Sequence, residues 1–109
     1  MATVPNWREA LDHFITQISV LYGRRLNSVI LYGSRARGDA EEQSDIDTIV
    51  ILDPMEDFWA EFERISPIAS RVSLDHNVVI SAIPIDSREF LSSGSPLCMN
   101  ARREGLRVA

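Results

Sequence analysis

The residues from Ile46 to Leu52 restrict the possible fold more than any other part of the chain. They read Ile-Asp-Thr-Ile-Val-Ile-Leu, a nearly continuous apolar run broken only near its start. A strand that is apolar on both sides belongs in the centre of a sheet whose two faces are both covered. The run therefore predicts a central strand in a mixed α/β (α+β) fold, a small mixed β-sheet flanked by helices.

Two further elements are predicted before this strand. Apolar residues recur at helical spacing from Trp7 to Tyr22, with Asn6 placed to cap the helix and Gly23 placed to end it. The segment from Ser28 to Tyr32 is apolar and too short for a helix, which predicts a buried strand. The chain thus begins with the order helix, strand, strand.

After the central strand, Asp53 and Pro54 predict the cap and first position of another helix. The residues predicted to form its buried stripe are Met55, Phe58, Trp59, Phe62 and Ile65. Pro67 is expected to interrupt this helix, because proline has no amide hydrogen to donate. The remaining predictions are a strand over Asn77 to Ile85, a helical turn over Asp86 to Leu91, a helix over Pro96 to Arg103 and a strand over Leu106 to Val108.

Composition limits the classes of function. A chain of 109 residues has room for a single domain, 1–109, and holds no apolar run near the ~20 residues that cross a bilayer. The net charge of −5 argues against general nucleic-acid binding. The chain has no lysine, which excludes a Walker-type phosphate loop and Schiff-base chemistry. The absence of a leader pattern and of a second cysteine beside Cys98 predicts a cytoplasmic location and no membrane role.

A glycine and a serine follow the first predicted strand. The chain turns at Gly33-Ser34 and is expected to enter a helix, which leaves backbone N–H groups and the Ser34 hydroxyl free to hold a phosphate. Arg35 and Arg37 stand beside this turn. The pattern is typical of a phosphate site, although a Gly-Ser turn alone is usually only a turn.

Two aspartates introduce the central strand. Asp45 and Asp47 lie two residues apart, so their side chains leave the same face of the strand, about 6.6 Å apart along it. Carboxylates near the buried end of a strand need a compensating charge, and Mg²⁺ prefers a few carboxylates together with substrate phosphates. The pair therefore predicts a magnesium site, and mutual repulsion is expected to raise the pKa of at least one member.

The spacing Gly33-Ser34, ten residues, then Asp45-Ile46-Asp47 resembles the motif of the polymerase-beta-like nucleotidyltransferase superfamily, and the small size resembles its minimal nucleotidyltransferase branch. The resemblance implies the nucleotidyltransferase fold, Gly33, Ser34 and Arg37 as nucleotide-binding residues, and Asp45 and Asp47 as catalytic metal ligands. It also implies Mg²⁺-dependent transfer of a nucleoside monophosphate, AMP from ATP, to a hydroxyl of a protein partner. Many members of the branch are antitoxins beside a HEPN-type toxin.

The family pattern includes a third carboxylate on a later strand. Two residues are candidates for that position: Asn77, which can bind a metal but cannot act as a base, and Asp75, two residues earlier. If the acid is absent, the alternative function is a binding module that keeps the fold and neutralises a partner by masking it. An antibiotic-modifying enzyme is a third reading, which the small size disfavours.

The other polar and aromatic residues receive structural interpretations. His13 and His76 are expected on the surface, and Trp59 in the core. Arg24 and Arg25 are expected at a helix terminus, where positive charge is favoured. A patch of exposed apolar residues on the C-terminal helices is the expected docking site for an acceptor.

Overall fold

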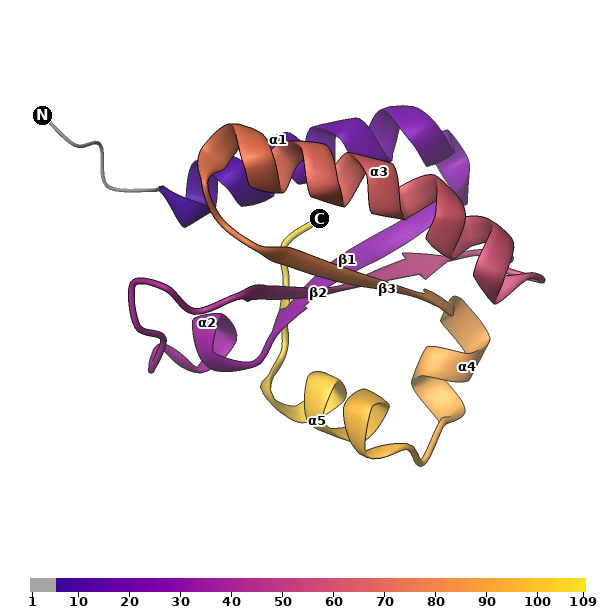
Figure 1. Cartoon of the computed structure of the whole chain (residues 1–109). Coiled ribbons are helices and arrows are strands. Elements are labelled where there is room, and N and C mark those ends of the chain that lie inside the picture. The colour runs from indigo at the N-terminus through magenta and orange to yellow at the C-terminus, as the bar shows by residue number, and fades with distance from the viewer. Residues whose placement is uncertain (1–5) are drawn as a thin grey trace, which may run out of the picture.

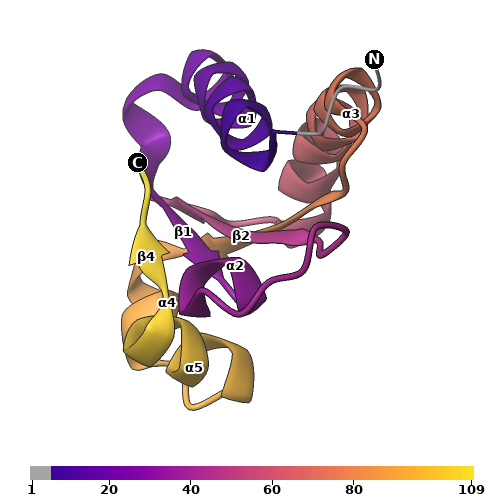
Figure 2. The same ribbon diagram turned by 90° about the vertical axis from the view of Figure 1, so that its left-hand side faces the viewer.

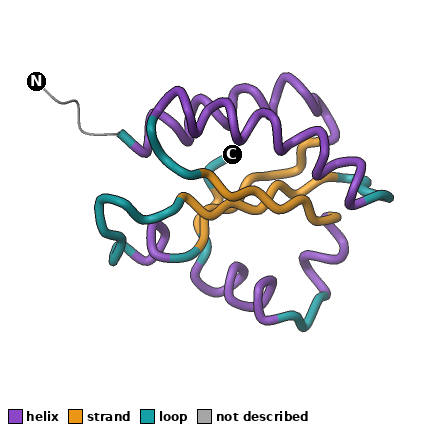
Figure 3. Tube along the Cα trace, in the orientation of Figure 1, coloured by secondary structure: helices purple, strands orange, loops and turns teal. Residues whose placement is uncertain are grey.

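A computed structural model describes residues 6–109, which form a four-stranded sheet between two layers of helices (Figure 1, Figure 3). The order of strands across the sheet is β3-β2-β1-β4. β1 is antiparallel to both of its neighbours, whereas β2 and β3 are parallel. The strands are β1 (Leu26–Tyr32), β2 (Ile46–Leu52), β3 (Ile80–Asp86) and β4 (Leu106–Arg107). The predicted mixed sheet is thus confirmed, with β2 inside it.

Helices cover both faces of the sheet (Figure 2). They are α1 (Trp7–Tyr22), the 3-10 helix η1 (Gly23–Arg25), α2 (Ser34–Arg37), α3 (Phe58–His76), α4 (Ser87–Ser92) and α5 (Pro96–Glu104). Val50 and Leu52 point into the core under α1 and α3, while Ile49 and Ile51 point into the core under α4 and α5. This alternation explains why β2 is apolar on both sides. No helix in residues 6–109 is both long and apolar enough to span a membrane.

The first helix forms as predicted. The side chain of Asn6 accepts hydrogen bonds from the amides of Arg8 and Glu9, at 3.1 and 3.3 Å, and so satisfies amides that the first turn leaves free. Gly23 ends the helix with a positive φ of 55°. The residues that α1 buries are Ala10, Leu11, Phe14, Ile18 and Tyr22.

The predicted beginning and interruption of the next helix are both wrong. Asp57, not Asp53, caps α3, with its side chain accepting from the amide of Ala60 at 3.2 Å. The helix then continues through Pro67 to His76. Pro67 and Glu63 both lie on the exposed side, so the carbonyl that proline leaves without a donor faces water.

The buried stripe of α3 also differs from the prediction. Its buried residues are Glu61, Ile65, Ala69 and Val72. Trp59 is 68% exposed and packs only at its edges against Phe58 and Phe62, with ring centroids 5.1 and 5.9 Å away. Phe58 and Phe62 are partly buried and Trp59 is exposed, so the aromatic residues of α3 lie beside its buried face rather than on it.

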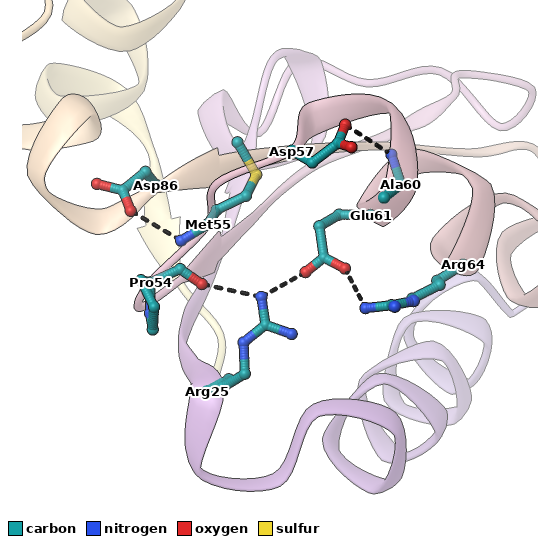
Figure 4. A network of polar contacts seen from close by, with 8 residues as sticks. All are labelled: Arg25, Pro54, Met55, Asp57, Ala60, Glu61, Arg64 and Asp86. Carbon is teal, nitrogen blue, oxygen red and sulfur yellow. Dashed lines mark hydrogen bonds and ion pairs between the residues drawn. The ribbon is translucent and has the colours of Figure 1, made fainter.

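The buried face of α3, where aromatic residues were expected, includes the carboxylate of Glu61 (Figure 4). Glu61 is 3% exposed and accepts from Arg25 at 2.6 Å and from Arg64 at 2.7 Å. Arg25 also donates to the carbonyl of Pro54 at 2.9 Å. Arg25 therefore joins η1 to the start of α3, a role that its expected place at a helix end did not indicate.

The chain after α3 follows the prediction except at its start. Asn77 ends the helix in the left-handed conformation, with φ of 54°, so β3 begins at Ile80 instead of Asn77. The two histidines expected on the surface are partly buried, and His13 Nδ1 and His76 Nε2 lie 3.0 Å apart, which joins α1 to α3. The predicted helical turn, helix and last strand correspond to α4, α5 and β4.

Candidate active site

The two halves of the Gly-Ser and Asp-x-Asp motif meet at one end of the sheet. β1 and β2 are antiparallel, and their register pairs Tyr32 with Asp47. The glycine that follows β1 therefore lies beside the aspartates that introduce β2. In Figure 1, α2 and the loop that leads into β2 lie together at this end of the sheet.

Gly33 and Asp47 are in direct contact. A Cβ placed on Gly33 would lie 2.6 Å from Asp47 Oδ2, and Gly33 has a φ of 74°. Both the close approach and the positive φ exclude other residues at low energy. The glycine of the motif is thus needed because a carboxylate packs against its backbone.

Ser34 begins the four-residue helix α2 directly after this contact. The carbonyl of Gly33 accepts from the amides of Ala36 and Arg37, both at 3.1 Å. The first amides of a helix, here those of Ser34 and Arg35, have no partner within it. Amide hydrogens next to two carboxylates suit a ligand that carries both anionic oxygens and a cation.

The two aspartates differ in burial. Asp45 is exposed, whereas Asp47 is partly buried. Burial and, to a smaller extent, the negative charge of Asp45 raise the pKa of Asp47 above 3.8. Burial and the charge of Asp47 likewise raise the pKa of Tyr32. The expected rise in pKa is confirmed for Asp47, but burial contributes more than repulsion.

β3 supplies the third side of the site. Its parallel register pairs Ser81 with Asp47, and the amide of Ile46 donates to the carbonyl of Val79 at 2.8 Å. Ile80 points into the core under α1 and α3, so Ser81, the next residue of β3, points to the opposite face, which also carries Asp47. The position of a third carboxylate on β3 therefore falls on a serine, with Val79 just before the strand.

Neither sequence candidate for the third carboxylate lies on β3. Asp75 is in the last turn of α3 and pairs with Arg71 at 3.5 Å, and Asn77 is the helix cap. Within residues 6–109 no group of three His, Cys, Asp or Glu side chains is placed to hold a metal. The sequence does not show how β2 and β3 pair. That pairing was needed to identify Val79 and Ser81.

The two arginines of α2 have different surroundings. Arg37 is 46% exposed and forms ion pairs with Asp39 at 3.2 Å and Glu104 at 4.0 Å. Arg35 instead turns toward the loop before β2, where it donates to the carbonyls of Glu42 and Ser44. Arg37 thus has the more accessible guanidinium, as expected of a residue that contacts phosphate.

The side chains present fit a hard divalent cation. Asp45, Asp47 and Ser81 offer only oxygen atoms, and an ionised Asp47 is buried without a compensating charge. Two carboxylates leave coordination positions for substrate phosphates and water, which is the arrangement that Mg²⁺ favours. Asp45 and Asp47 are therefore the residues that could hold it.

Comparison with known proteins agrees with this geometry. Residues 11–103 match the family model "Nucleotidyltransferase domain". Two relatives from Methanocaldococcus jannaschii carry the name "Putative protein adenylyltransferase". One is 40% identical over 75 residues, which covers 69% of this chain and 75% of the relative; the other is 32% identical over 87 residues, 80% of each.

Solved structures share the fold at low sequence identity. A structure described as a "putative nucleotidyltransferase" from Sulfolobus solfataricus superimposes with a TM-score of 0.67 at 17% identity, over 91% of this chain and 76% of that one. A structure described as a toxin-antitoxin with AMP-PNP gives 0.62 at 20% identity, over 88% and 70%. Together with the family match, these observations show that the chain belongs to the nucleotidyltransferase domain family.

Proposed function

We propose that this nucleotidyltransferase transfers AMP from ATP, with Mg²⁺, to a hydroxyl group of a protein partner. The observation that carries the proposal is the contact of Asp47 with Gly33, which puts a partly buried carboxylate against the first turn of α2. The names of the M. jannaschii relatives support protein as the acceptor and AMP as the transferred group.

Each part of the site has a role in this reaction. Ser34 and the first amides of α2 bind the phosphates, Arg37 neutralises their charge, and Asp45 and Asp47 hold Mg²⁺. Bound Mg²⁺ supplies charge stabilisation for the departing pyrophosphate. The acceptor oxygen bonds to the α-phosphorus as the bond to the β-phosphate oxygen breaks. The hydroxyl proton passes to water, since no third carboxylate within residues 6–109 joins the two aspartates.

We further propose that the partner is a HEPN-type toxin and that this chain is its antitoxin. One structure of this fold is described as a tri-AMPylated HEPN toxin from Shewanella oneidensis in complex with an MNT antitoxin, with a TM-score of 0.53 and 20% identity. The exposed apolar residues Leu91 on α4 and Met99 on α5 are candidate docking contacts, being 74% and 45% exposed. The charge of −5 supports a protein rather than nucleic acid as the partner.

The second candidate function is neutralisation by masking, without transfer. Val79 and Ser81 favour it, because β3 offers no carboxylate on the face that carries Asp45 and Asp47. A protein that has lost the acid can keep the fold and the docking surface. The two functions differ in whether label from ATP reaches the partner.

Incubation with α-labelled ATP, Mg²⁺ and a lysate of the host tests the proposal directly. We expect a labelled protein band with the wild type, no band with Asp47→Asn, and an unchanged band with Glu41→Gln, which removes an exposed acid of the neighbouring loop. Absence of label with the wild type, together with label from Val79→Asp, would mean a site one acid short of activity and would favour the masking function.

A further inference from the structure

The side chain of Arg35 connects the last part of the loop between α2 and β2 to α2. Arg35 Nη2 donates to the carbonyl of Glu42 and to the carbonyl of Ser44, each at 3.1 Å. The second carbonyl belongs to the peptide bond that joins Ser44 to Asp45. Arg35 therefore reaches from the phosphate-binding turn to within one peptide bond of a proposed metal ligand.

A second contact fixes the guanidinium itself. Arg35 lies over the ring of Trp7 with its Cζ 5.1 Å from the ring centroid. Trp7 is the first residue of α1 and precedes the stretch matched by the family model, residues 11–103. A stacked guanidinium is held in plane, so its donors keep a fixed direction.

The same contacts disfavour Arg35 as a phosphate ligand. Its Nε is buried and has no hydrogen-bond partner, and its Nη2 is already engaged by two backbone carbonyls. A triphosphate bound at α2 would have to remove these contacts first. Arg37 has an exposed guanidinium, and its pairs with Asp39 and Glu104 are surface ion pairs, which are weak and can be exchanged for phosphate.

The loop contains hydrogen bonds of its own, between Glu41 and Ser44. The amide of Ser44 donates to the carbonyl of Glu41 at 3.0 Å, and the amide of Glu41 donates to the Ser44 hydroxyl at 2.9 Å. These two bonds close a turn, and Arg35 is bonded to its last carbonyl. Loss of Arg35 would leave the turn free to move together with the residue that follows it.

We propose that Arg35, stacked on Trp7, is a positioning residue that holds Asp45 in register with the Gly33-Ser34 turn. The inference rests on the proposed metal and nucleotide chemistry of the site, and it adds a residue that acts through Asp45 without touching substrate. Arginine is required because the two hydrogens of its Nη2 can serve both carbonyls while the rest of the guanidinium lies over the indole; the ammonium of lysine cannot do both.

Hydrogen exchange of the full chain without ligands tests the structural half. In Arg35→Gln the amides of Glu41 and Ser44 should exchange about ten-fold faster, since a hydrogen bond to a charged group is lost. Amides in the centre of β2, such as that of Val50, should not change. Trp7→Leu should give a smaller effect in the same amides. Arg8→Gln is the matched control, because Arg8 also lies over Trp7, at 4.9 Å, but does not bond to the loop.

Binding of AMP-PNP with and without Mg²⁺ tests the positioning half. Arg35→Gln should weaken binding about ten-fold with Mg²⁺ present and leave it unchanged in EDTA, because Asp45 acts through the metal. Arg37→Gln should weaken binding under both conditions. Arg35→Lys should restore part of the affinity.

Three results would overturn the proposal. One is normal exchange of the Glu41 and Ser44 amides in Arg35→Gln. Another is faster exchange with unchanged affinity in Mg²⁺, and the third is an affinity loss that persists in EDTA, which would make Arg35 a phosphate ligand. If the wild type binds no nucleotide at all, the proposed function fails, whereas the exchange data still decide whether Arg35 orders the loop.

Discussion

On one face of the sheet lie α1 and α3, with 16 and 19 residues, and on the other lie α4 and α5, with 6 and 9. The longer helices cover their face and bury its side chains, including Phe14 at 0% exposure. The shorter pair leaves the end of the opposite face open, where Asp47 and Ser81 lie side by side. The difference suggests a division of labour, in which one face supplies stability and the other leaves room for chemistry.

The largest expected effect is a loss of activity. It results from a change on the face that α4 and α5 cover only in part. Asp47→Asn should lower nucleotidyl transfer about 10³-fold, since it removes a proposed ligand of Mg²⁺. The charge of that ion would stabilise the transition state. The melting temperature without Mg²⁺ should not fall, because an ionised carboxylate is no longer buried. Label transfer and thermal melting measure the two quantities, and a large loss of stability would contradict the division between the faces.

Matched truncations compare the cores of the two faces. Phe14→Ala under α1 should lower the free energy of unfolding by about 4 kcal/mol, because a fully buried ring leaves a cavity. Phe90 in α4 is 8% exposed and lies under short helices that can close over the space, so Phe90→Ala should have a smaller effect. Urea unfolding measures both, and equal losses would show that the faces contribute alike.

The open face should also accept a new acid. Val79→Asp adds a carboxylate at the residue whose carbonyl accepts from the amide of Ile46, between the two aspartates, and a general base contributes about 100-fold to a rate. Because Val79 is 57% exposed, the change should have little effect on stability. Ser81→Asp, deeper on the same face, is the companion variant. A rate of label transfer that neither variant raises would mean that β3 does not supply the missing group.

The two positive-φ glycines that flank α2 allow a further comparison. Gly33→Ala should lower stability by about 1–2 kcal/mol from backbone strain and should also displace Asp47. Gly38 is left-handed, with φ of 83° and ψ of 11°, so Gly38→Ala has a smaller strain, and its Cβ would meet open space. Both variants should lower the melting temperature, whereas only Gly33→Ala should also reduce AMP-PNP binding. Equal binding by the two variants would argue against the Gly33–Asp47 contact.

The smallest effect is an opposite pH dependence of two carboxylates. The pKa of Asp47 is raised above 3.8, so an ionised Asp47 lowers stability as the pH rises through its native pKa. The amide of Met55 donates to Asp86 and lowers its pKa, so Asp86 adds stability that is lost as the pH falls through that value. Relative to wild type, Asp47→Asn should therefore gain stability from acid to neutral pH, and Asp86→Asn should lose it. Urea unfolding across this range measures the sign.

Features decided by neighbours in the chain were predictable from sequence. The cap at Asn6, the two-sided strand β2 and the grouping of Gly33 with Asp47 follow from local patterns. Contacts between distant segments were not predictable. Glu61 reads as a surface acid until Arg25 is known to reach it, and Asp53-Pro54 resembles a helix start although Asp57 provides the cap.

The third position of the site shows the same limit. Asn77 and Asp75 stand at a plausible distance in the sequence. However, α3 extends to His76, so Asp75 lies in its last turn and Asn77 is its C-cap. Which residue faces Asp47 is then set by the register of β3, and a shift of one residue would have reversed the faces. The metal and nucleotide roles of the site residues stay predictions until binding is measured.

The contact between Gly33 and Asp47 has a consequence for engineering. Its two residues are held together by the β1–β2 pairing, so their contact does not depend on the length of the chain that connects them. Closing a longer loop has a small entropic cost, about 0.6 kcal/mol for each doubling. The segment at Asp39 and Ala40, ahead of the turn closed between Glu41 and Ser44, should therefore tolerate inserted peptides, such as an affinity tag or a fluorescent reporter, beside a working site.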